Sequence, residues 1–345
     1  MSQKILNTYI PLVVFPVLSA LALKLTYGNV VEAGLLPIID QNCPAQLTSL
    51  ELTPHRLDYL GVPSVDQRIC GFVSFFHLAL TPEVLPFLTY FMASTMALLA
   101  IPAFESWRAG RHSILALPVL FGLMMQIMTV GAVLPLYWLI FILTGTAQRR
   151  GRGEDTKISA AHAQAVIFGL NLGAGIPSVC LLVLQDPHVT ALWQLFPLWQ
   201  FLAQSGHLLV RRPSADPGSG YSWIRALYIG AFIIASSTHV GTLARAETLE
   251  GIKAVFLPSV APLTSAASNL KALDMLQWDA FFAYTSTLLG TVWFAEDARQ
   301  AAGIILWNVI GSIMVGPGAA IAAVALWRES HLHPSARVEA KEKSK

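Results

Sequence analysis

Residues 276–293 read LQWDAFFAYTSTLLGTVW, an apolar stretch about as long as a membrane-crossing helix requires. The stretch carries a single charged residue, Asp279, close to its start. An ionised side chain near the hydrocarbon layer is costly unless it is paired, protonated or directed at a cavity. The stretch therefore predicts a helix of a membrane bundle and makes Asp279 a candidate functional acid.

The composition of the whole chain supports a membrane protein. Of 345 residues, 54% are hydrophobic and 12% are charged, and the mean hydropathy is +0.58. A soluble domain would carry roughly twice that charged fraction. The formal net charge of +2 shows no basic excess, so the sequence predicts no nucleic-acid partner.

Seven apolar runs are long enough to cross a bilayer, and the run nearest the N-terminus is interpreted as a retained helix rather than a cleaved signal. They lie at about 8–25, 72–103, 161–184, 189–210, 223–244, 278–295 and 301–327. The further block 112–148 is either one kinked pass or a tight hairpin, and its basic flanks favour the hairpin. We predict an all-α polytopic membrane bundle with eight to nine transmembrane helices.

The polar segments define the expected organisation. Residues 1–328 form one polytopic membrane domain with a polar loop at about 27–68, and residues 329–345 form a polar C-terminal tail. Arginines cluster in QRRGRG (148–153) and RRPSADPG (211–218), which predicts that both loops face the cytosol. Localisation to the endoplasmic reticulum is expected, and Cys43 and Cys70 can form a disulfide if the loop that they flank is lumenal. The oligomeric state is not predicted.

On a helix, Asp279 shares one face with aromatic and small residues. That face contains Asp279, Phe282, Ala283, Ser286, Gly290 and Trp293. A carboxyl group beside aromatic rings suits chemistry that generates a carbocation, because the face of a ring attracts a cation within about 6 Å. The alternative interpretation is an N-cap near the interface beside Trp278. The residues alone leave both interpretations open.

Two other acids are candidates. Glu105 lies three residues before Arg108, so an interfacial ion pair is an alternative to a functional role. Asp66 opens the second apolar run and has the sequence context of an N-cap. No His, Cys, Asp or Glu cluster has metal-ligand spacing, and no phosphate-binding loop or nucleophile elbow is present, so we expect neither metal nor cofactor.

Four stretches together resemble the small integral-membrane terpene cyclases of fungal meroterpenoid pathways, of the ascochlorin, ascofuranone and macrophorin type. They are VDQRICGFVSFFHLAL (65–80), AFESWRAGR (103–111), GAVLPLYWLI (131–140) and LQWDAFF (276–282). The resemblance implies a metal-independent cyclisation in which a carboxylic acid protonates an epoxide or a terminal olefin of a prenylated aromatic or cyclohexenone. The partners that it implies are a hydrophobic prenylated small molecule and the lipid bilayer.

Carried over to this chain, the resemblance makes Asp279 or Glu105 the acid, with Asp66 third. We expect Phe282, Trp278, Trp293 and Tyr137 to bind the substrate. An apolar surrounding would favour the protonated form of the acid. Two alternatives stay open: a polytopic transporter with an intramembrane acidic site, and a membrane scaffold whose acids only cap and pair.

Overall fold

The computed structural model describes residues 4–45, 53–149, 156–215 and 218–333, and all regular elements in these ranges are helices. The helices, in chain order, are α1 (Ile10–Leu23), α2 (Asn29–Glu32), α3 (Leu35–Asn42), α4 (Pro63–Ala79), α5 (Leu85–Ser94), α6 (Met96–Glu105), α7 (Pro118–Met128), α8 (Val130–Leu143), α9 (Ala160–Gly169), α10 (Ile176–Leu184), α11 (Pro187–Trp193), α12 (Phe196–Val210), α13 (Tyr221–Arg245), α14 (Leu249–Phe256), α15 (Ser268–Thr291), α16 (Ala298–Met314) and α17 (Pro317–Leu332). Shorter 3-10 or π segments are η1 (Ile5–Tyr9), η2 (Lys24–Gly28), η3 (Ser113–Ala116), η5 (Leu170–Gly175), η6 (Pro213–Ala215) and η7 (Val292–Phe294). The predicted all-α class is confirmed.

Among the residues that the structure describes, four continuous helical segments are long and apolar enough to cross a membrane. They are Ile5–Glu32, Leu85–Glu105, Ala160–Leu184 and Tyr221–Arg245. The expected eight to nine spans are therefore not confirmed. The central helix α15 has sufficient length, but Lys271, Asp274 and Asp279 raise its polarity, and all three are buried among neighbouring helices.

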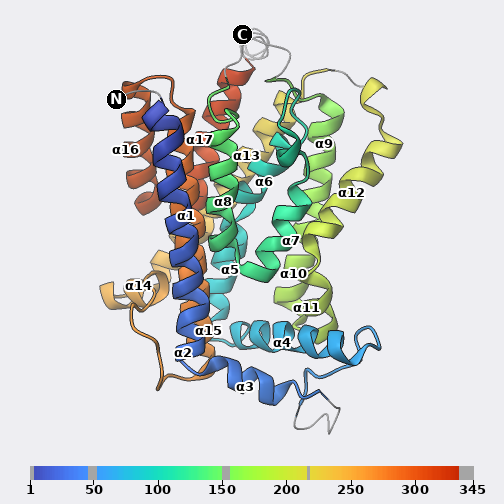
Figure 1. Cartoon of the computed structure of the whole chain (residues 1–345), viewed down its shortest axis with the longest axis vertical. Coiled ribbons are helices and arrows are strands. Elements are labelled where there is room, and N and C mark those ends of the chain that lie inside the picture. The colour runs from blue at the N-terminus through green and yellow to red at the C-terminus, as the bar shows by residue number, and fades with distance from the viewer. Residues whose placement is uncertain (1–3, 46–52, 150–155, 216–217, 334–345) are drawn as a thin grey trace.

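The predicted span 72–103 is wrong, because the chain leaves the helix at residues 80–84 and restarts at Leu85. The first part belongs to α4, which lies across one end of the bundle beside α3 (Figure 1). Only the second part, α5 with α6, runs along the bundle. Hydropathy does not separate these two parts, since residues 72–79 of α4 are predominantly apolar as well.

Two apolar blocks fold back on themselves inside the bundle. The block 112–148 forms the hairpin α7–α8, with its tip at Thr129, and the run 301–327 forms α16–α17, with its tip at Gly316. Both tip residues have a positive φ, 84° at Thr129 and 91° at Gly316. Helices of this kind rise about 1.5 Å per residue, so neither α7 nor α8 alone crosses a hydrocarbon layer of about 30 Å. The block 112–148 thus folds as the hairpin that its basic flanks favour, but the two membrane passes expected of that hairpin are not confirmed.

The two ends of the bundle differ in chemistry (Figure 1). At the end that we call the disulfide end, Cys43 after α3 pairs with Cys70 in α4, with 5.7 Å between their Cα atoms. At the opposite, basic end, α1 begins, α17 ends, and Arg149 donates to the backbone at Gly110. Arg149 and residues 211–215, the described parts of the two clustered-arginine stretches, lie at this end, and residues 150–155 and 216–217 are outside the described ranges.

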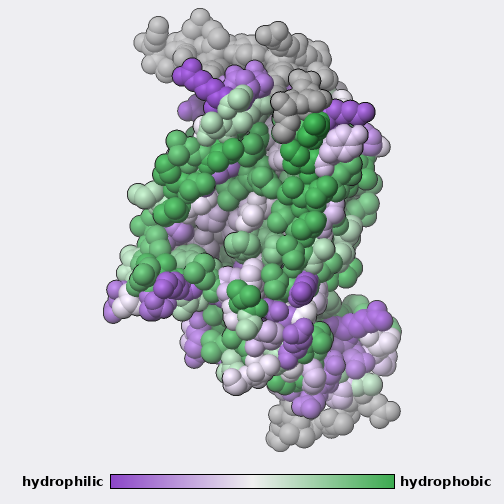
Figure 2. All heavy atoms as spheres, turned by 60° about the vertical axis from the view of Figure 1, so that its left-hand side comes forward, coloured by the Kyte–Doolittle hydropathy of each residue, from purple (hydrophilic) through white to green (hydrophobic). Residues whose placement is uncertain are grey.

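The surface between the two ends is predominantly apolar. Figure 2 shows hydrophobic side chains over the middle of the visible face and polar side chains toward both ends. Large apolar side chains that are more than half exposed include Val13, Ile127, Val179 and Ile313. An exposed apolar band between polar ends is the pattern expected of a protein surrounded by lipid.

Candidate active site

Asp279 holds the start of another helix. It lies in the middle of α15, is 7% exposed, and its Oδ1 accepts a hydrogen bond from the Gly131 amide at 2.5 Å. Gly131 is in the first turn of α8, where backbone N–H groups have no partner within their own helix. The expected cap at the start of its own helix is therefore wrong, because α15 begins at Ser268. Asp279 instead caps α8 from the side.

The fit around this cap is tight. A Cβ added to Gly131 would lie 2.5 Å from the backbone oxygen of Asp279 and 3.0 Å from its Oδ1. Thr129, with φ 84°, supplies the break that turns the first amides of α8 toward α15. A β-branched residue with positive φ is uncommon, and such strain persists where the surrounding structure imposes it.

Two predicted substrate-binding aromatics lie beside Asp279. Trp278 stacks on Phe282 with ring centroids 5.7 Å apart, and its indole nitrogen donates to the carbonyl of Ser259. Phe282 is 3% exposed and packs with Ala22 and Ala132. The acid and two of the rings therefore lie together, as the sequence predicts.

Trp293 is remote from this group. It follows Asp279 by fourteen residues, which is about 20 Å along a helix, and it packs on Phe15. All six residues of the predicted face of α15 are buried. That face packs against α8, where Trp138 donates to Thr287 and leaves no room for a side chain at Gly290.

Glu105 belongs to a buried cluster of four charged groups. Its Oε1 accepts from Arg108 at 2.8 Å and from Arg328 at 2.7 Å. Arg108 also pairs with Glu329, and all four side chains are at most 6% exposed. The predicted pair with Arg108 is confirmed, but the pair is buried inside the bundle and not exposed. Two acids and two arginines give this charged quartet no formal net charge.

Backbone carbonyls complete the quartet. Arg108 donates to Thr156 at 2.5 Å, and Arg328 donates to Thr146 at 3.1 Å. The guanidinium carbon of Arg328 lies 4.4 Å from the ring centroid of Phe294. The expected boundary of the C-terminal tail at residues 328/329 falls within α17, and residues 334–345 lie outside the described ranges.

Several polar atoms of this cluster have no hydrogen-bond partner among the described residues. They are Glu105 Oε2, Glu329 Oε2, Arg328 Nε, Tyr137 Oη and His333 Nε2. Tyr137 is close enough to Glu105 to experience its charge. The predicted aromatic Tyr137 therefore accompanies Glu105 and not Asp279. The sequence alone did not mark Arg328 and Glu329 as candidates. The helical pattern continues past residue 327 into these two residues, and this continuation could have indicated that they belong to the bundle.

Asp66 is separate from both acids. It lies in α4 at the disulfide end, is 1% exposed, and its Oδ1 accepts from the Leu60 amide at 2.8 Å. The predicted N-cap is wrong, because Val62 occupies that position and Asp66 is inside the helix. Its contact fastens the preceding loop to α4.

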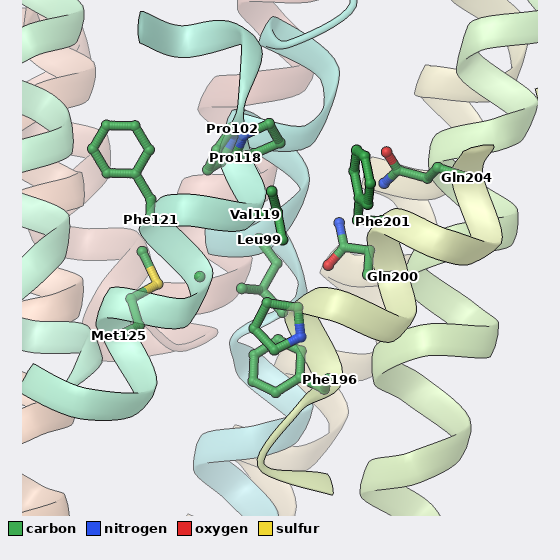
Figure 3. A pocket seen from close by; sticks show the side chains of 12 residues that line it. Leu99, Pro102, Pro118, Val119, Phe121, Met125, Phe196, Gln200, Phe201 and Gln204 are labelled. Atoms are coloured by element: carbon green, nitrogen blue, oxygen red, sulfur yellow. The ribbon is translucent and has the colours of Figure 1, made fainter. Parts of the chain in front are cut away.

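Two hollows lie outside these acid clusters. A narrow cleft of about 30 Å³ opens between α6, α7 and α12, and its lining includes Phe121, Phe196 and Phe201 (Figure 3). A groove of about 430 Å³ runs between α16 and α17, with Trp307 and Trp327 among its lining. Within the described parts of the chain, no three His, Cys, Asp or Glu side chains are grouped closely enough to hold a metal ion.

Comparison with known proteins relates the chain to fungal enzymes. Terpene cyclase ctvD of Aspergillus terreus is 24% identical over 344 residues, which cover 91% of this chain and 97% of that protein. Terpene cyclase ascI of Acremonium egyptiacum is 25% identical over 229 residues, 61% of this chain and 59% of that protein. FAD-dependent monooxygenase verC1 of Penicillium polonicum is 22% identical over 252 residues, 68% of this chain but 31% of that protein. No solved structure matches.

A family model matches nearly the whole chain. The CtvD domain covers residues 11–333, which include both acid clusters, three of the four long apolar segments in full and the first from residue 11 on. The resemblance predicted from the four sequence stretches is thereby confirmed. The chain belongs to the CtvD domain family, among fungal terpene cyclases.

Proposed function

We propose that this chain is a membrane-bound, metal-independent terpene cyclase that starts ring closure by protonating an epoxide or terminal olefin of a prenylated aromatic or related meroterpenoid intermediate. The observation that carries the proposal is Asp279, a buried carboxyl that pairs with no described cation and lies beside Trp278 and Phe282. Burial without a counter-ion favours the neutral acid, which is the form that can give up a proton.

The proposed reaction is an isomerisation. The Gly131 amide engages Oδ1 of Asp279, and we place the acidic proton on Oδ2. Transfer of that proton opens the epoxide C–O bond or adds to the terminal olefin, and the next C=C bond attacks the carbocation that forms. Loss of a proton from a neighbouring carbon ends the sequence, so the mass is unchanged. The rings stabilise the cation, and exclusion of water prevents its capture as an alcohol.

Glu105 is the second candidate for the acid. Two guanidinium groups, from Arg108 and Arg328, bind its Oε1, so this carboxylate is held as a hydrogen-bond acceptor. Such a group suits removal of the final proton or stabilisation of positive charge better than donation. We therefore rank Asp279 above Glu105 as the proton donor, and we place Asp66 last, since it lies in α4 at the disulfide end.

The epoxide version of the substrate has support from a relative. Part of verC1, a protein named as an FAD-dependent monooxygenase, is similar to this chain. Monooxygenases of this class can insert an oxygen atom into an olefin. The similarity between part of verC1 and this chain is therefore consistent with oxygenation of the substrate immediately before cyclisation.

We propose that the basic end faces the cytosol and the disulfide end faces the lumen of the endoplasmic reticulum. Clustered arginines in short loops resist translocation, and disulfides form in oxidising compartments. Glycosylation tags inserted after Arg149 and after Thr53 report the two sides. Modification of the first tag and not the second would reverse this topology.

A direct assay tests the reaction. Microsomes that contain the chain are incubated with a farnesylated phenol, with and without a terminal epoxide, and the products are searched for isomers of unchanged mass. We expect cyclic isomers that depend on the protein and persist in EDTA. Absence of isomers with well-folded protein, or a reversible requirement for magnesium, would overturn the proposed mechanism.

The transporter interpretation has one structural feature in its favour. Helices interrupted inside the bundle, as at Thr129 and Gly316, also form substrate sites in secondary transporters. In that case Asp279 would bind a proton or cation, and proton-coupled uptake into vesicles would replace isomer formation. The names of the relatives favour the cyclase.

A further inference from the structure

The cleft between α6, α7 and α12 is chemically graded from one end to the other. Leu99, Val119, Phe121 and Phe196 give it apolar walls (Figure 3). The only polar side chains in its lining are Gln200 and Gln204 of α12. Gln204 accepts from the indole of Trp107, which follows α6 toward the basic end. The cleft thus has a polar end near the basic end of the bundle and an apolar remainder.

The cleft runs between the levels of the two buried acids. At its polar end, Pro102 precedes Glu105 by one helical turn, and Phe121 meets the ring of Tyr137 edge-on at 5.3 Å. At its apolar end lies Met125, whose carbonyl accepts from the Thr129 amide at 3.0 Å. Thr129 begins the turn that Asp279 caps. The apolar end therefore approaches the acid that we propose as the proton donor.

The cleft must widen to hold a ligand. Its volume of about 30 Å³ holds roughly one water molecule, so any larger ligand must part α7 from α12. These two helices are in close contact where Gly122 faces Pro197, and a Cβ at Gly122 would lie 2.6 Å from the Pro197 Cβ. No hydrogen bond between the described residues of α7 and α12 opposes the movement. Non-helical residues, Leu117 and Thr129, flank α7 and can act as hinges.

We propose that this cleft binds the isoprenoid chain of the substrate, with the polar head group at Gln200 and Gln204 and the terminal isoprene unit at Met125. This inference rests on the proposed cyclase function and adds to it the direction of the substrate. A branched apolar chain matches aromatic and aliphatic walls. The head group finds two amide side chains, and the reacting end is delivered toward Asp279.

The groove between α16 and α17 is the competing site. It is larger, about 430 Å³, but its lining comes from these two helices alone. No described hydrogen bond or ring contact joins its lining residues to Asp279 or to the turn at Thr129. The larger volume favours the groove as the substrate site, whereas the connection from Met125 through Thr129 to Asp279 favours the cleft.

Photolabelling of the full-length chain decides between the two sites. The probe is a farnesylated phenol with a diazirine on its terminal isoprene unit, and unlabelled farnesylated phenol is the competitor. We expect competed labelling of peptides from α7 and α12. Labelling of α16 and α17, labelling spread over all helices, or labelling that the competitor does not reduce would overturn the assignment.

Matched filling variants provide a second measurement. Val119→Phe narrows the cleft, and we expect the KM for a farnesylated phenol to rise tenfold or more with a smaller change in kcat. Gly303→Leu fills the competing groove, where a Cβ meets no atom within 4 Å, and we expect no change. The opposite ranking would refute the cleft. If Val119→Phe fails to fold, the labelling of the unmodified chain decides.

Labelling and isomer formation, measured on the same samples, test this inference and the proposed function separately. Isomer formation by the unmodified chain with labelling outside the cleft would overturn the cleft alone. Competed labelling of α7 and α12 without any isomer would leave a prenyl-binding site and overturn the cyclase.

Discussion

Helix α8 faces a buried acid at two levels, and the two surroundings are opposites. At its first turn, Asp279 is a single carboxyl held by a backbone amide, between aromatic rings and without a described cationic partner. Farther along, Tyr137 faces Glu105, which shares two arginines with Glu329. Equal burial therefore does not imply equal chemistry. A lone acid can exchange a proton, whereas a compensated acid chiefly joins helices together.

The largest effect is expected when the charge of Glu105 is removed. Glu105→Gln leaves two buried arginines with one carboxylate, and breaking a buried pair in this way costs about 3–5 kcal/mol. We expect a large fall in the free energy of unfolding and in the amount of folded protein, measured by thermal unfolding in detergent. An interfacial pair with Arg108 alone would have cost at most about 1 kcal/mol.

Two controls accompany that variant. Adding Arg328→Gln restores neutrality, so the double variant should be more stable than Glu105→Gln. Glu250→Gln removes an exposed partner of Lys253, whose side chain is 49% exposed, and should be nearly silent. If the double variant is no more stable than the single one, charge neutrality does not stabilise the quartet.

The next largest effect is expected on turnover at Asp279. Asp279→Asn keeps an oxygen that can accept from the Gly131 amide but removes the acidic proton, so cyclisation should fall about a hundredfold or more at nearly unchanged stability. Asp274→Asn is the matched control, because Asp274 is also buried in α15 and also accepts from a backbone amide, that of Ser259. Full activity of Asp279→Asn would leave Asp279 as a cap only.

Gly131 links the capping and the catalytic roles of Asp279. Gly131→Ala places a Cβ 2.5 Å from the Asp279 carbonyl oxygen, and such overpacking costs about 1–3 kcal/mol. We expect a lower Tm and a loss of turnover greater than the loss of folded enzyme, because the carboxyl must shift. Gly230→Ala in α13, where the added Cβ meets nothing within 4 Å, should not lower stability. Normal turnover of Gly131→Ala at reduced Tm would separate the cap from catalysis.

Features that depend on residues close together in the sequence could be predicted, whereas contacts between distant segments could not. Local patterns sufficed for the helical class, the buried face of α15, the grouping of Trp278 and Phe282 with Asp279, and the pairing of Glu105 with Arg108. Hydropathy could not reveal the breaks at Thr129 and Gly316, because apolar residues continue through both. Contacts made by distant segments also left no local pattern: Arg328 lies 223 residues from Glu105, and Gly131 lies 148 residues from Asp279.

The smallest expected effect concerns pH and the disulfide end, away from both acids. His55 in the loop before α4 and His77 in α4 have ring centroids 4.3 Å apart, and His77 contacts Thr190 of α11. Burial lowers the pKa of His55, and burial with the neighbouring His55 lowers the pKa of His77 to about 4, although Asp186 opposes the shift. Both lowered pKa values mean that the fold favours neutral rings.

The sign of the pH effect follows from these shifts. In the unfolded chain a histidine has a pKa of about 6.5. The contribution of the two neutral rings to the free energy of unfolding is therefore complete above that pH and is lost as the pH falls toward about 4. We expect the Tm of the unmodified chain to fall across this window more than that of the double variant His55→Phe/His77→Gln. Effects of acid on the rest of the fold act in both proteins and cancel in the difference. Parallel Tm curves would show that the histidine pair does not report pH, and the loss of stability in acid would then arise from groups other than these two rings.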